Sequence, residues 1–242
     1  MMRLWLLLLF FVVAGDAQDG ADGRIDTFDL RMALPPGASP MIELGTVSVS
    51  LARLRHKPNP KAVSAFRKGE KFAGGAEVDK AVMALELAVA LDGEFSEAHC
   101  NLGVQYQRAG RFREAAVEFG RAVELDATTG VYHSNFAVAL AALEEHETAL
   151  KEAMLAIDLN STDATAHLIA GWELASSVST RDSAISHLQF ASRAFADAHL
   201  LLALIWMAGR DSVAAQKEVN SYWDFGKTRQ NRGLNRGDPG LR

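Results

Sequence analysis

Hydrophobic positions along most of the chain follow a helical spacing that itself repeats about every 34 residues. Between residues 61 and 223, apolar side chains recur three and four positions apart, which is typical of helices that bury one face. Aligning residues 62–91 with residues 96–125 places Gly69 over Gly103 and Phe72 over Tyr106. These aligned positions, which we call columns, recur in two further units. A fifth unit matches them more poorly. A period of this length predicts an all-α solenoid of about five antiparallel helix pairs.

Small residues recur where the two helices of each unit would cross. Gly103 on the first helix and Ala115 on the second allow two backbones to approach closely. The "AGR" stretch at residues 109–111 predicts the break between those helices. The "STD" stretch at residues 161–163, together with Asp182, predicts N-caps where later helices begin.

The columns resemble the tetratricopeptide repeat (TPR) family over roughly residues 62–223. The second unit carries the family's aromatic or His, Leu, small, Tyr-like, Ala, aromatic and Ala positions, in that order, as His99, Leu102, Gly103, Tyr106, Ala115, Phe119 and Ala122. The resemblance implies a right-handed solenoid, in a domain that we place at residues 61–223. The family's usual proline between repeats is replaced by Gly93, Ala127 and Ser161, which predicts looser turns.

The segments outside the repeats have a different character. Residues 1–17 show one Arg, an apolar run from Leu4 to Ala14 and small residues before a cleavage point after Ala17, which is typical of a secretory signal peptide. Residues 18–60 contain two alternating stretches, 27–34 and 45–54, which predict short strands or an extended leader lying on the next domain. Residues 224–242 are basic and poor in apolar side chains, which predicts a disordered tail.

Composition narrows the possible partners. The net charge of −5 gives no reason to expect nucleic acid as a partner. Cys100 is the single cysteine, so no internal disulfide is possible and the fold must rest on packing. The signal peptide and the lack of a cysteine after the apolar run predict a secreted or periplasmic protein without a lipid anchor.

No motif for chemistry stands out. His99 and Cys100 are neighbours on a helix, so their side chains diverge by about 100° and cannot act as a nucleophile and base pair. A column of four histidines could suggest a metal ladder, meaning ions bound between histidines of successive repeats. Equivalent helices of packed repeats lie about 8–10 Å apart, however, so two such histidines are too far from each other to share one ion. That column consists of His99, His133, His167 and His199. We therefore expect no metal, no cofactor and no enzymatic activity, and interpret the column as filling the aromatic position.

A stripe on the first helix of each unit is the better functional candidate. In the TPR family this stripe lines the concave ligand-binding surface. The peptide-binding residues that the resemblance implies here are Cys100, Val104, Gln107, Arg108, Ser134, Val138, Leu168, Trp172, Leu200 and Leu204. The stripe lacks the Lys and Asn with which some TPR domains clamp a carboxylate. We expect Leu168, Trp172 and Leu204 to form an apolar pocket, unless the C-terminal segment or closure of the superhelix covers them.

The sequence thus predicts a non-catalytic protein-interaction scaffold of the bacterial cell envelope that binds a peptide or protein in its groove. The alternative is a carrier of a small hydrophobic ligand or lipid that uses the same stripe inside a closed cavity. The basic tail could add a peripheral membrane contact. The pattern specifies no oligomeric state.

Overall fold

The structure is a computed structural model that describes residues 56–75 and 77–235, with side chains as far as residue 225. Within these residues the chain forms ten α-helices, one short 3-10 helix and no strand. The α-helices are α3 (Pro60–Ala73), α4 (Val78–Leu91), α5 (Ser96–Arg108), α6 (Phe112–Leu125), α7 (Gly130–Ala142), α8 (His146–Leu159), α9 (Ala164–Leu174), α10 (Arg181–Ala191), α11 (Asp197–Ala208) and α12 (Ser212–Asn235).

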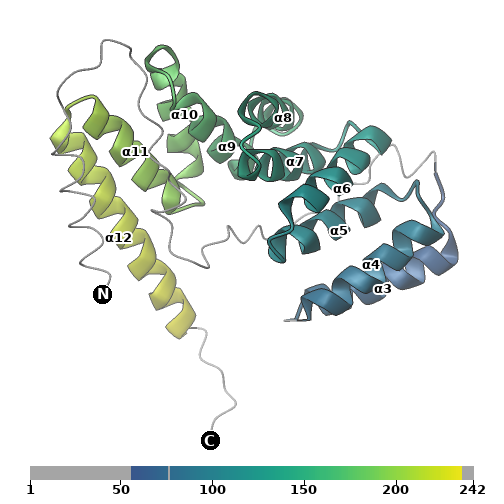
Figure 1. Ribbon diagram of the computed structural model, residues 1–242. Helices are drawn as coiled ribbons and strands as arrows, with labels where there is room; N and C mark the ends of the chain where they lie inside the picture. The colour runs from purple at the N-terminus through teal and green to yellow at the C-terminus, as the bar shows by residue number, and fades with distance from the viewer. Residues whose placement is uncertain (1–55, 76, 236–242) are drawn as a thin grey trace, which may run out of the picture.

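Consecutive helices pack as five antiparallel pairs, α3–α4 through α11–α12, that follow one another along a curved array (Figure 1). Each pair also contacts the next one through the second helix of one repeat and the first helix of the following repeat. This arrangement confirms the predicted all-α solenoid. Stacking is needed because each pair has more apolar surface than it can bury alone.

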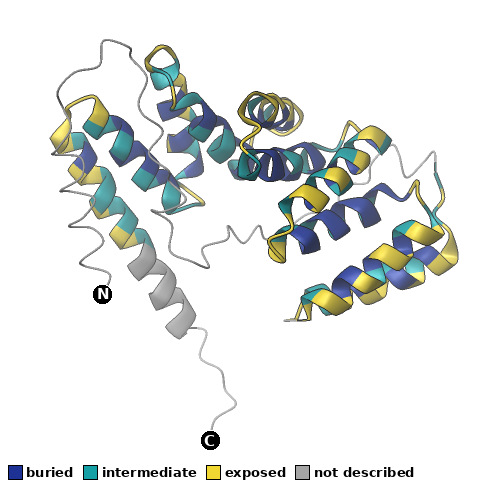
Figure 2. Cartoon of the chain, in the orientation of Figure 1, coloured by how far each residue is buried: buried dark blue, intermediate teal, exposed yellow. Residues whose placement is uncertain are grey.

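The recurring small residues lie at the crossings inside the pairs. A Cβ added at Gly69 would lie 2.6 Å from Leu85 Cγ, and one at Gly171 would lie 2.6 Å from Leu188 Cγ. The alanines of the same columns, including Ala81, Ala115 and Ala149, are fully buried. The prediction that these columns mediate close helix packing is therefore confirmed, and α5 and α7 are the most buried helices of the array (Figure 2).

The turn within a repeat needs one residue in the left-handed region. In the second repeat this residue is Gly110, with φ of 74°. Glu144 and Arg210 occupy the matching position with φ of 63° and 62°, where a side chain costs about 1–2 kcal/mol. The turn geometry is thus imposed by the packing of the two helices, even where the local sequence opposes it.

The predicted N-caps are correct at one position and wrong at the other. The Asp163 carboxylate accepts hydrogen bonds from the N–H groups of Thr165 and Ala166 at the start of α9. Asp182 does not cap α10, because that helix already begins at Arg181 and Asp182 lies inside its first turn. The difference comes from the 3-10 helix η2 (Val178–Thr180), which accommodates the extra residue of this repeat and is capped by Ser177.

Side chains hold the turns between repeats where the family has proline. Asp92, Asp126 and Asn160 follow α4, α6 and α8, and each accepts a hydrogen bond from the backbone N–H two residues later. Burial alone would raise the pKa of Asp92, but hydrogen bonds from Asn59 N–H, the His56 ring and Glu94 N–H lower it overall. The absence of proline predicts looser turns, whereas these hydrogen bonds restrain the turns.

The chain ends of the repeat domain differ from the predicted boundaries. Helix α12 continues to Asn235, so residues 224–235 are helical, whereas the sequence predicted a disordered tail from residue 224. Extending an existing helix needs no new nucleus, and Lys, Arg and Gln favour it, which explains the difference. The predicted signal peptide, the two predicted strands and residues 236–242 lie outside the described residues.

Candidate peptide-binding groove

The first helices of the first four repeats line the inner side of the curve. Helices α3, α5, α7 and α9 contact one another in sequence, whereas the second helices of successive repeats have no comparable contacts. Helices on the inside of a curved array lie closer together than those outside. The part of the predicted stripe on α5, α7 and α9 therefore runs along the inner side, and the stripe as a whole has three parts that differ in burial.

The N-terminal part contains an open pocket of about 410 Å³. Its apolar walls are Phe66 on α3 and Phe95 before α5, whose ring centroids lie 4.9 Å apart. Lys57, Arg67 and Glu70 supply charged groups at the same pocket. The mixture suits a ligand side chain that combines an apolar body with a polar end.

The middle part of the stripe is largely buried. Cys100, Ser134 and Val138 are 3%, 2% and 8% exposed, so they form the floor of the inner face, while Val104 and Gln107 are half-buried. Burial raises the pKa of the Cys100 thiol to about 12, which keeps it protonated. Burial therefore disfavours a reactive thiolate at this position.

Asn135 was not singled out from the sequence, because one amide in a helix carries no pattern. It is 1% exposed, and its Nδ2 donates to Cys100 Sγ at 3.5 Å. Its Oδ1 has no hydrogen-bond partner, which is unusual for a buried acceptor. Asn135 therefore leaves one buried acceptor unpaired where α5 meets α7.

Arg108 is already engaged by the protein. Its guanidinium donates to the Ala73 carbonyl at 2.8 Å, to Gln105 Oε1 at 3.0 Å and to the Gly75 carbonyl at 3.4 Å. These bonds satisfy backbone acceptors at the end of α3. Arg108 thus ties two repeats together rather than pointing freely at a ligand.

The C-terminal part of the stripe is apolar and half-buried. Leu168 and Trp172 on α9 pack against the core formed by α10 and α11, and Leu200 and Leu204 on α11 are partly exposed. The α10–α11 core covers part of Trp172 but leaves some of it accessible. This packing is a different kind of cover from the two that the sequence analysis named, the C-terminal segment and closure of the superhelix.

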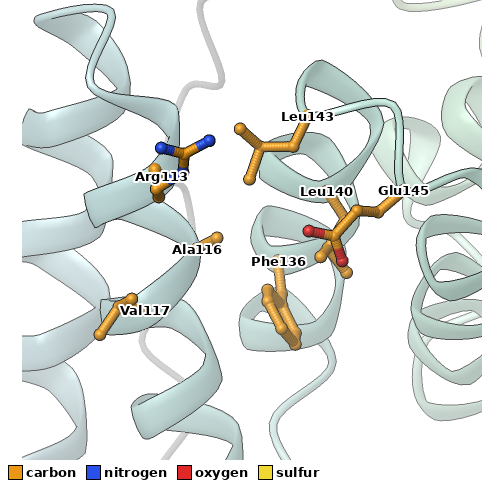
Figure 3. Close-up of a pocket in the computed structure, with 7 residues that line it drawn as sticks. All are labelled: Arg113, Ala116, Val117, Phe136, Leu140, Leu143 and Glu145. Atoms are coloured by element: carbon orange, nitrogen blue, oxygen red, sulfur yellow. The ribbon is translucent and has the colours of Figure 1, made fainter.

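A second open pocket, of about 320 Å³, lies away from the predicted stripe, between α6 and α7 (Figure 3). Arg113, Ala116 and Val117 line it from α6, and Leu143 faces them across the gap. Phe136, Leu140 and Glu145 complete its lining. Sequence reasoning missed this pocket because its residues come from parts of two repeats that no column connects.

The histidine column has partners that the sequence did not reveal. The Nδ1 atoms of His99, His133 and His199 each lie 2.7 Å from a glutamate oxygen of the second helix, in Glu118, Glu152 and Glu218 respectively. The Nε2 atoms of His99 and His133 lie 3.2 and 3.1 Å from the carbonyls of Gly93 and Ala127. The recurring spacing of 19 residues between His and Glu was the signal that could have identified these pairs.

No cluster of three or more His, Cys, Asp or Glu side chains with metal-binding geometry occurs among the described residues. The helices in this part of the chain are also too short or too polar to cross a membrane.

The comparisons with known proteins show the fold. No protein-family model and no curated protein matches the chain. A crystal structure of MamA is similar over 67% of this chain and 96% of its own, with 21% identity and a TM-score of 0.58. MamA from Desulfovibrio magneticus RS-1 is similar over 71% of this chain and 98% of its own, with 14% identity and a TM-score of 0.62.

YrrB, described as a TPR protein with an unusual peptide-binding site, is similar over 72% of this chain and 89% of its own. Its identity is 21% and its TM-score is 0.57. These likenesses agree with the paired helices of the chain. The chain therefore has the tetratricopeptide-repeat fold that its residue columns predicted.

Proposed function

We propose that this protein is a non-catalytic scaffold of the cell envelope that binds a peptide or protein segment along the inner side of its solenoid. The observation that carries the proposal is the partly exposed apolar surface of Leu168, Trp172 and Leu204 at the C-terminal part of the inner stripe. A half-buried Trp on a rigid helical frame is the kind of side chain that dominates binding energy at interfaces.

A further feature supports a peptide as the ligand. The N-terminal pocket beside Phe66 and Phe95 gives a second apolar anchor point. An extended peptide can reach two separated anchor points.

The similarity in fold to YrrB is consistent with this proposal, since that protein is described as having a peptide-binding site. The location in the cell envelope rests on the signal-peptide pattern of residues 1–17. The alternative, a lipid carrier, needs an enclosed apolar cavity, and both pockets described above are open to solvent. We therefore favour the peptide.

The experiment is affinity capture from envelope extracts with the immobilised full chain, compared with Trp172→Ala and with Trp223→Ala as the matched control. Trp223 is 36% exposed and lies on α12, a helix that carries no residue of the stripe. We expect a protein that the wild type and Trp223→Ala retain and that Trp172→Ala loses. Because Trp172 also packs on the core, the helical content and melting temperature of each variant are measured alongside, and Leu204→Gln provides a second variant.

Equal retention by all variants that remain folded would remove the groove from the proposal. Recovery of lipid in an organic extract of the purified protein, without a bound protein, would favour the carrier instead.

A further inference from the structure

One member of the histidine column has a different partner. In the fourth repeat, His167 Nδ1 faces His187 Nδ1 at 2.9 Å, whereas the column in three other repeats faces a glutamate. His187 follows His167 by 20 residues rather than 19. The one-residue insertion and the change from Glu to His together produce a facing pair of imidazoles.

We propose that His167 and His187 form a binding site for a late transition-metal dication, with Cu²⁺ as the best fit, held by the two Nδ1 atoms and completed by water. This site differs from the ladder that the sequence analysis excluded. That ladder would have joined histidines of different repeats, whereas this pair joins the two helices of one repeat. The inference does not depend on the proposed peptide-binding function.

The hydrogen bond from His167 to Ser161 fixes which nitrogen of the ring carries the lone pair. His167 Nε2 lies 3.2 Å from the Ser161 carbonyl, which only accepts, so this nitrogen carries the hydrogen. The lone pair of neutral His167 is then on Nδ1, at the edge of the ring that faces His187. Metal-binding histidines commonly donate their other N–H to a backbone carbonyl in this way, which fixes the ring orientation.

The second ligand becomes available through a change of tautomer. In the metal-free pair, His187 Nδ1 donates its hydrogen to His167 Nδ1. When a metal binds, that hydrogen leaves Nδ1 of His187 and one is taken up from water at Nε2, so the neutral ring keeps its charge.

The ring of His167 is held in place by a neighbouring aromatic side chain. Phe190 on α10 stacks on it with ring centroids 4.1 Å apart and an angle of 27° between the rings. A fixed ring loses little conformational freedom on binding a ligand. The Arg193 guanidinium lies 5.3 Å from the centre of the Phe190 ring, on the outer part of the same stack.

The distance between the two ligand atoms is compatible with one group of coordination geometries. With bonds of about 2.0–2.1 Å, nitrogens 2.9 Å apart subtend an angle of about 90° at the ion. That angle matches adjacent positions of a square-planar or tetragonal site, the geometry of Cu²⁺ and Ni²⁺. No third His, Cys, Asp or Glu of the described chain joins the pair. Hard ions such as Ca²⁺ and Mg²⁺, which need oxygen ligands, are therefore poor candidates.

The test is a titration of the untagged full chain with Cu²⁺ alone, followed by isothermal calorimetry and by electron paramagnetic resonance. We expect binding of one Cu²⁺ with nitrogen couplings from two imidazoles, and no response to Mg²⁺. His187→Gln should weaken Cu²⁺ binding at least about tenfold. Removing a group that only supports a metal ligand already lowers metal affinity by that amount, and removing the ligand itself should have at least the same effect.

The matched control is His199→Gln, which removes a column histidine whose partner is Glu218, and it should leave Cu²⁺ binding unchanged. Equal Cu²⁺ binding by wild type and His187→Gln would overturn the proposal. So would a spectrum of the wild type with fewer than two imidazole nitrogens. That second measurement needs no variant, so it decides the question even if His187→Gln fails to fold.

Discussion

A Cβ atom added to Gly103 would lie 2.7 Å from Cε1 of Phe119, a ring that is fully buried where α5 crosses α6. Atoms of a buried ring cannot move away without disturbing their own neighbours, because protein interiors are close-packed. The absence of one methyl group therefore determines how closely the two helices of the second repeat approach. Gly69 with Leu85 and Gly171 with Leu188 show the same relationship.

We expect Gly103→Ala to destabilise the protein. Overpacking costs about 1–3 kcal/mol, which outweighs the gain of up to about 1 kcal/mol in helix propensity. The control is Gly120→Ala on α6, where the added Cβ would lie at an ordinary 3.5 Å from the Phe136 ring. That variant should be more stable than the wild type. Urea unfolding measures both, and a Gly103→Ala protein as stable as Gly120→Ala would contradict the packing argument.

Glu152→Gln should lower the free energy of unfolding by about 1–3 kcal/mol. The pair of Glu152 and His133 is almost completely buried, with side chains 11% and 5% exposed, so solvent cannot replace the lost charge. Glu114→Gln is the comparison, since Glu114 and Arg111 form an exposed pair that solvent screens and its loss should change stability little. Thermal melting of the two variants is sufficient, and similar losses in both would show that burial does not determine the effect.

The stability of the fourth repeat should depend on pH through His187. Burial and the neighbouring His167 lower the pKa of His187 below its ordinary 6.5, so the unfolded chain binds this proton more readily than the folded one. The contribution is complete above about pH 6.5 and is lost as the pH falls through the lowered pKa of the folded state. Near the pair, the Ser161 carbonyl lies 3.2 Å from His167 Nε2, the Phe190 ring stacks on His167, and the Arg193 guanidinium lies 5.3 Å from the centre of the Phe190 ring.

Urea midpoints at about pH 7.5 and about pH 5.5, measured without metal, test this expectation. The drop towards the lower pH should be smaller in His187→Gln than in the wild type. An identical drop in both proteins would assign the pH dependence to other groups.

Cys100 should not react with thiol reagents while the protein is folded. Its side chain is 3% exposed, and burial raises the pKa of the thiol to about 12, so the reactive thiolate is scarce at neutral pH. Unfolding in denaturant should restore the reactivity of an ordinary cysteine. The rate of Ellman's reagent with native and denatured protein gives the comparison, and rapid labelling of the native form would show that the floor of the groove opens.

Much of the fold could be predicted from single columns of residues. Gly103, Ala115 and their equivalents recur because two helices cross at the same place in each repeat, and a small residue is needed wherever backbones approach. Asp163 could be identified as an N-cap because capping depends on residues two and three positions away. The end of α12 was missed because propensity alone does not show how far an existing helix continues.

The candidate site could be predicted only in outline. Helical spacing placed Cys100, Ser134 and Trp172 on one face, but exposure depends on how closely successive first helices pack, which no single helix encodes. The same holds for Arg108, whose three acceptors include the carbonyl of Ala73 at the end of α3, 35 residues away, and that of Gly75 just beyond it, 33 residues away. The sequence by itself therefore determined the repeating helix pairs, because local periodicity and residue size are sufficient for them. Only the tertiary structure decided which inner residues remain accessible and which histidines meet, because both depend on contacts between side chains distant in sequence.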